Sequence, residues 1–255
     1  MNEDIENILR QWKFNQDEIA NVRLIDGKDG HKKIQLRIDM GIIQMEMDDN
    51  PSGETVEGFE SWLEYYEDKQ KKFEASKVDD YFSLNSDECR NLETEAVRYY
   101  YRYFSLMKLD DYDRVIRDTE RNLRVLKFVK KYASSELDSW ELNQFKPYII
   151  MMNTRARVSV ALRDKSDTVV ENAVELCDKG IAVIKIFFKE YNIYEEKENS
   201  DEITILQNLK DELTGIMPES LEKKLLKAIE EERYEDAAFI RDEIRKKKGR
   251  KNING

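Results

Sequence analysis

One loop of the chain has the residue types and spacing of a calcium site. Its oxygen-bearing side chains alternate with other residues and end at a glycine, as in the first half of an EF-hand loop: Asp48, Asn50, Ser52 and Gly53. Calcium affinity in such a loop depends on a bidentate glutamate at the twelfth position, where this chain has Phe59. We therefore expect a plain β-turn and no metal site here.

The glycines that follow imitate a phosphate-binding loop. Gly53 and Gly58 have the spacing of the P-loop glycines, but Phe59 and Glu60 stand where lysine and serine or threonine would contact phosphates. This difference predicts no nucleotide binding at the loop.

The other reactive side chains lack partners at useful spacing. His31, the single histidine, falls in a turn beside Asp29, and a general base needs a positioned partner. Cys89 and Cys177 are too far apart in sequence to form a local zinc pair, and we expect both to be buried apolar fillers. The sequence thus predicts no catalytic, cofactor-binding or metal residues, and a protein that is not an enzyme.

Composition favours a mainly helical protein. The 255 residues include only 9 glycines and 3 prolines, with 38% charged and 40% apolar side chains, a balance typical of long helices with one buried face. The net charge of -11 opposes non-specific DNA binding by the body of the protein. The acidic N-terminus and the lack of an 18-residue apolar run predict a cytoplasmic protein without membrane contact.

Strand patterns are confined to the N-terminal region. Residues 22–25, 33–38 and 42–47 alternate between apolar and polar and are separated by glycine-containing turns, which predicts a three-stranded meander. Helices are expected at about 2–12 and 58–75. One face of the meander carries the polar residues Gln35, Arg37, Asp39, Gln44 and Glu46. They could line a polar site, but we favour an exposed face with cross-strand pairs such as Arg37 with Glu46.

Apolar residues recur at helical spacing from about residue 85 onward, which predicts two pairs of antiparallel helices. A capping box at Thr168 and Glu171 should open the last of these helices. The second pair resembles a tetratricopeptide (TPR) hairpin at Val160, Ala161, Ala173 and Gly180, but the two pairs are about 56 residues apart instead of ~34, so we describe them as TPR-like. An aromatic cluster could supply a stacking platform for bases, but we favour core and groove lining: Tyr99, Tyr100, Tyr101, Tyr103 and Phe104.

The C-terminal segment has the most specific motif. Leu221 and Leu225 precede an aromatic-Glu-x-Ala-Ala run that begins at Tyr234, and Ile240-Arg241-Asp242-x-Ile244 follows. This pattern resembles the UVR motif, a helical hairpin of the UvrB and UvrC excision-repair subunits. The rest of the chain resembles a group of uncharacterised bacterial UVR-motif proteins with an N-terminal β-meander and TPR-like helices. The resemblance implies protein contacts and, since the nuclease and helicase regions are missing, no repair catalysis.

These observations predict a mainly α protein with a small antiparallel β-meander, TPR-like helical hairpins and a C-terminal UVR helical hairpin. The expected domains are 1–58, 59–216, and 217–255 with its basic tail. We expect an intracellular scaffold or adaptor with a helical groove. Its UVR hairpin is expected to contact either the helical region at 59–216 or a second UVR hairpin, from another copy of the chain or from another protein. The expected contact residues are Leu221, Leu225, Ile229, Tyr234, Ala237, Ala238, Ile240, Arg241, Asp242 and Ile244.

The alternative is a repair-linked accessory factor that binds nucleic acid. Its support is the basic tail, which has six positive charges between Arg245 and Lys251. Cations are also favoured at a helix C-terminus by the helix dipole, and we give that structural explanation preference. We therefore expect a protein partner, and neither nucleic acid nor a cofactor.

Overall fold

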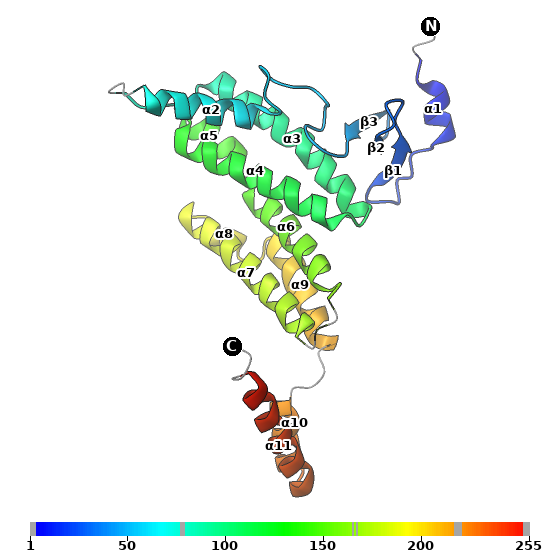
Figure 1. The fold of residues 1–255 in the computed structure, drawn as a ribbon, viewed down its shortest axis with the longest axis vertical. Helices are drawn as coiled ribbons and strands as arrows, with labels where there is room; N and C mark the ends of the chain where they lie inside the picture. Colours follow the sequence, from blue (N-terminus) through cyan, green and yellow to red (C-terminus); the bar gives the residue numbers. More distant parts are fainter. Residues whose placement is uncertain (1–3, 77–79, 165, 167, 217–220, 252–255) are drawn as a thin grey trace. The chain divides into compact units, whose positions relative to one another are not determined.

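The computed structural model describes residues 4–76, 80–164, 166, 168–216 and 221–251, and in the last segment it describes helical side chains only from 225 to 242. Its contacts divide the chain into two compact units, Met1–Asn208 and Leu209–Gly255. The sheet and most helices belong to the first unit, and the C-terminal hairpin belongs to the second (Figure 1). The fold is mainly α with a small antiparallel sheet, which confirms the predicted fold class.

The sheet is the predicted meander, with strand order β1-β2-β3 and both pairs antiparallel. Its strands are β1 (Asn21–Asp26), β2 (Lys32–Ile38) and β3 (Gly41–Glu46). Ile34 and Leu36 of β2 are buried, together with Met45 of β3, and they join the core beside α3. The alternation of apolar residues in the sequence therefore identified the strands correctly.

The predicted pairing of Arg37 with Glu46 is wrong. The tight connection between β2 and β3 places Ile38 opposite Gly41, and this register puts Lys33 opposite Glu46 and Arg37 opposite Ile42. Lys33 forms the ion pair with Glu46.

The polar face of the meander is also less exposed than expected. Gln35 and Arg37 are buried, because neighbouring side chains and the N-terminal segment lie over them. Gln35 accepts a hydrogen bond from Arg23 and donates one to Gln44. Arg37 donates to the backbone carbonyl of Trp12 at 3.1 Å. Hydrogen bonds within the sheet and to the N-terminal segment thus occupy this face.

The first unit also contains helices that account for most of its length. They are α1 (Glu6–Gln11), α2 (Trp62–Ala75), α3 (Ser86–Lys108), α4 (Tyr112–Tyr132), α5 (Glu136–Asn143), α6 (Lys146–Ala161), α7 (Val169–Glu190) and α8 (Tyr194–Lys197), followed by α9 (Asp201–Ile216), which crosses into the second unit. None of the helices in the described residues is long and apolar enough to cross a membrane.

Helix capping differs from the sequence prediction. Thr168 is the N-cap residue of α7, but its side chain makes no capping hydrogen bond, so the predicted capping box is not formed. A complete capping box instead opens α3, where the Asn85 side chain accepts from the Glu88 backbone and the Glu88 carboxylate accepts from the Asn85 backbone. Asparagine followed by glutamate three residues later carries the same signal, which the sequence analysis missed.

Successive helices pack in pairs, α3 with α4 and α6 with α7, and α4 also packs on α6. Gly180 of α7 allows a close approach of the helices, since a Cβ atom there would lie 2.5 Å from Thr154 Oγ1 of α6 and 3.1 Å from Leu206 Cδ1 of α9. Both cysteines are buried, as predicted: Cys89 in the core shared by α2, α3, α4 and α5, and Cys177 in α7.

A buried arginine fixes the loop after β3 to the helices. Arg102 of α3 forms a bidentate ion pair with Asp118 of α4, with N–O distances of 2.7 and 2.9 Å, and both side chains are 1% exposed. Its Nη1 atom also donates to the backbone carbonyls of Glu46, Asp48 and Asp49. One side chain therefore joins the sheet, the loop and two helices.

A buried glutamate does the same for the next part of the loop. Glu95 of α3 accepts hydrogen bonds from the Asn50 side chain and from the backbone N–H of Trp62 at the start of α2. It also forms an ion pair with Arg121 of α4. These contacts explain why the sheet and the helices belong to one unit, with the predicted boundary at residues 58 and 59 inside it.

Candidate functional site

The C-terminal hairpin consists of α10 (Leu221–Glu230) and α11 (Tyr234–Lys251). Between them the chain turns at Glu232, whose φ of +57° is in the left-handed region, and the Arg233 backbone N–H donates to the Ala228 carbonyl at 2.7 Å. The Arg233 side chain pairs with Asp236 in the first turn of α11. Tyr234 begins the second helix, as predicted.

Small residues form the contact between the two helices. Ala228 of α10 and Ala237 of α11 are 0% and 7% exposed, and Leu225 and Ile240 are half-buried. Ala238, the second alanine of the Ala-Ala pair and also a predicted partner-contact residue, is exposed. Adjacent helical positions differ by about 100°, so one alanine faces the partner helix and the other faces away.

Both helices of the hairpin expose large apolar side chains. Leu226, Ile229, Tyr234 and Phe239 are 61%, 47%, 66% and 66% exposed, and we call them the exposed hairpin residues. Leu226 and Ile229 share a face of α10, since they are three positions apart. Exposed apolar side chains of this size are available for contact with another protein.

Two of the exposed hairpin residues, Ile229 and Tyr234, were among the predicted contact residues; Leu226 and Phe239 were missed. The signal for them was the pairing of adjacent apolar residues, at 225–226 and 239–240, because only one member of each pair can face the opposite helix.

The remaining predicted contact residues are of two kinds. Two are the last residues of α11 whose side chains the structure describes, and two have side chains that it does not describe. Arg241 and Asp242 are exposed and lie 3.6 Å from each other, nitrogen to oxygen. Leu221 and Ile244 belong to α10 and α11, but their side chains, like those of the basic tail, are outside the described residues.

The helices of the first unit line an apolar cavity of about 510 Å³, which we call the groove cavity. Its walls come from α3, α4, α5 and α6, with Phe145 between the last two, and the start of α9 adds one carboxylate. The lining residues are Glu93, Ala96, Val97, Tyr100, Tyr101, Tyr103, Asn122, Leu126, Leu142, Phe145, Tyr148, Ile149 and Glu202. Tyr100, Tyr101 and Tyr103 of the predicted cluster thus line a groove, while Tyr99 is buried with its ring beside Arg102 and Arg121.

Aromatic rings form one wall of the groove cavity. Tyr100 of α3 and Tyr148 of α6 are half-buried, with ring centroids 5.9 Å apart. Burial, with Tyr100 nearby, raises the pKa of Tyr148 to about 12, and burial raises the pKa of Tyr103 as well. These phenols are therefore neutral near pH 7 and offer uncharged ring faces and hydroxyl groups.

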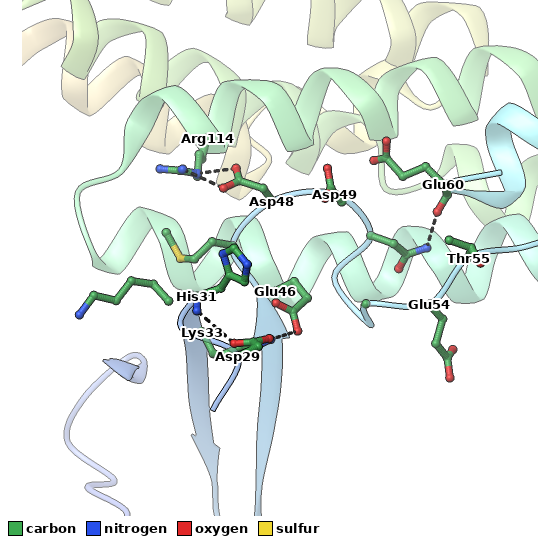
Figure 2. A pocket seen from close by; sticks show the side chains of 14 residues that line it. Asp29, His31, Lys33, Glu46, Asp48, Asp49, Glu54, Thr55, Glu60 and Arg114 are labelled. Carbon is green, nitrogen blue, oxygen red and sulfur yellow. Dashed lines mark hydrogen bonds and ion pairs between the residues drawn. The ribbon is translucent and has the colours of Figure 1, made fainter. Parts of the chain in front are cut away.

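A second cavity, of about 930 Å³, lies where the β1–β2 turn and the loop after β3 meet α4 (Figure 2). Charged side chains on its wall pair with each other. Asp48 accepts from Arg114 Nε and Nη2 at 2.9 and 3.0 Å, and Lys33 pairs with Asp29 and Glu46. The guanidinium of Arg114 lowers the pKa of Asp48 to about 2, so this carboxylate is ionised and already paired near pH 7.

The loop from Asp48 to Gly53, which resembles the first half of an EF-hand loop, forms the turn that the sequence predicts. The Gly53 backbone N–H donates to the Asn50 carbonyl at 2.8 Å, and Gly53 has a φ of +72°. Both oxygens of Asp48 accept from arginine, and Asn50 donates to the Glu60 carbonyl. The side chains that would contact a cation therefore already have partners.

The glycines of the P-loop-like segment also have a structural role. The backbones of Val56 and Phe59 exchange two hydrogen bonds of 2.8 Å, and Gly58 has a φ of +83° within this tight turn. The turn therefore points its backbone groups at each other instead of at a phosphate. His31, at the rim of the cavity in Figure 2, is exposed.

A comparison with protein families identifies the C-terminal hairpin. Residues 219–250 match the family model described as UvrB/uvrC motif. No curated protein and no solved structure matches the chain. The protein therefore carries a UVR motif, a type of helical hairpin associated with protein interaction and DNA repair.

Proposed function

We propose that the protein is an intracellular adaptor that binds a partner protein through the exposed hairpin residues. The observation that carries this proposal is the exposure of four large apolar side chains between residues 226 and 239 of a UVR hairpin. A helical hairpin with exposed apolar side chains fits another helical hairpin, because ridges of side chains on each can fill grooves on the other. The proposed partner is therefore a second UVR hairpin, from another copy or from another protein.

The hairpin's own geometry supports this proposal. Alanines at the helix contact bring α10 and α11 close together, which leaves the larger residues Leu226 and Phe239 outside. Two short helices are marginally stable alone, and burial of these side chains against a partner would stabilise both.

We also propose that the protein has no catalytic activity of its own. The two loops that imitate ion and phosphate sites have their polar groups engaged in internal hydrogen bonds and ion pairs. The groove cavity has apolar walls and suits binding better than chemistry.

Affinity capture from the cells that make the protein tests the proposal. The full chain, its Phe239→Asp variant and its Lys227→Ala variant are used as baits; Lys227 is an exposed polar residue of α10 and serves as the matched control. We expect Phe239→Asp to reduce the yield of captured partner at least tenfold, because a charge replaces a central apolar contact. Equal yields from all three baits would contradict the proposal.

A further inference from the structure

We propose that the groove cavity binds a basic peptide segment of a partner protein, with one large apolar side chain inserted between the tyrosines. This inference rests on the proposed adaptor function and adds the chemistry of the partner at a second site.

The size and walls of the groove cavity suit one large side chain and its neighbours. Its volume of about 510 Å³ is within the usual range of about 300–1,000 Å³ for ligand pockets. The ring faces of Tyr100 and Tyr148, with Leu126, Leu142 and Ile149, provide apolar contacts. Aromatic walls of this kind bind aromatic and long aliphatic side chains well.

The rim shows that the occupant extends beyond the cavity. Val97 of α3 and Phe145 at the start of α6 line the cavity but are 43% and 55% exposed. A small molecule within the cavity would leave their outer surfaces in water. A peptide segment that crosses the opening would cover both, which favours a peptide over a small ligand.

Charge selects a basic peptide. The only charged residues in the described lining are the carboxylates Glu93 and Glu202, and neither forms an ion pair with a residue that the structure describes. Tyrosine ring faces attract cations, and the net charge of -11 also attracts a basic segment. Lysine or arginine beside the inserted side chain can therefore reach a carboxylate, while an acidic peptide would be repelled.

Selection from a random nine-residue peptide library with the full chain as bait tests the proposal. We expect enriched sequences to combine a large apolar residue with adjacent lysine or arginine. The best peptide, synthesised and titrated by calorimetry, should bind at least tenfold more weakly to the Glu93→Gln, Glu202→Gln double variant. It should bind equally weakly to Val97→Lys, which places a cation at the opening.

Two matched controls are available on α7. Glu171→Gln removes a first-turn carboxylate, as Glu202→Gln does, and Val183→Lys changes a valine that is 44% exposed, against 43% for Val97. Neither residue lines the groove cavity, so both variants should bind the peptide with wild-type affinity. Circular dichroism of each variant confirms that the helices are retained.

Several results would overturn the proposal. These are enrichment of acidic or uncharged peptides, failure to enrich any peptide, and wild-type affinity in the cavity variants. Tighter peptide binding after deletion of residues 245–255 would identify the chain's own basic tail as the occupant and also overturn it. Phe239→Asp should leave peptide binding unchanged, so failure at the groove cavity is distinguishable from failure of the hairpin contact.

Discussion

Replacement of Arg102 by methionine should destabilise the first unit strongly. The guanidinium is 1% exposed, pairs with Asp118 through two hydrogen bonds, and donates to three backbone carbonyls of the loop after β3. Methionine fills a similar volume but donates no hydrogen bond. We expect the free energy of unfolding to fall by about 3–5 kcal/mol, the cost of removing one partner of a buried ion pair.

The magnitude follows from the groups left behind. Asp118 would stay buried, with Arg117 as its remaining charged partner in the structure. The carbonyls of Glu46, Asp48 and Asp49 would each lose one donor, and an unsatisfied buried polar group costs about 1–3 kcal/mol. The loop can admit water to its carbonyls, so these costs do not add in full.

Urea unfolding followed by circular dichroism measures the effect. Arg114→Met is the control, because Arg114 and Asp48 are 37% and 55% exposed and such a pair contributes about 0–1 kcal/mol. The double variant Arg102→Met, Asp118→Leu should recover part of the loss, since it leaves no buried charge unpaired at that position. A loss below about 1 kcal/mol for Arg102→Met would refute the assignment of this pair as the anchor of the loop.

Gly180→Ala should lower the free energy of unfolding by about 1–3 kcal/mol, because the new Cβ atom would meet Thr154 Oγ1 at 2.5 Å. Gly215→Ala is the control, since there is open space at its Cβ position, and it should be neutral or stabilising in the same urea titration. Asp48, with a pKa of about 2, contributes stability above its unfolded pKa of about 4 and loses it as pH falls toward 2. The stability difference between the wild-type chain and Asp48→Asn should therefore shrink over that pH range.

Other outcomes would contradict these two predictions. Equal effects of the two glycine substitutions would show that α6, α7 and α9 do not pack closely at Gly180. A stability difference for Asp48→Asn that stays constant between pH 4 and pH 2 would show that Arg114 does not depress the pKa of this carboxyl.

Local patterns in the sequence predicted the elements well. Alternation identified the three strands, and helical spacing identified the helix pairs, because both depend on residues a few positions apart. The register of β2 and β3 was missed, since it is set by the length of the turn at Asp39. The capping box at Asn85 was missed although its residues are local, and the box predicted at Thr168 does not form.

Long-range polar contacts could not be predicted from the sequence. Arg102 and Glu95 lie among apolar residues on α3, and nothing in their spacing identifies a loop some fifty positions away as their partner. The sequence predicted that a helical groove exists but not where it lies, because the walls of the groove cavity come from helices far apart in the chain. In the hairpin, the sequence predicted the two helices but not which apolar residues are exposed.

The central claim is that the exposed hairpin residues form the surface that contacts a partner. Photo-crosslinking in the cells that make the protein tests it most directly, with benzoylphenylalanine in place of Phe239 in one chain and in place of Lys227 in another. The side chain at 239 keeps the aromatic character of the native residue and should crosslink to a partner protein, while position 227 should yield little or no product. No adduct from position 239, or the same adducts in equal yield from both positions, would contradict the account.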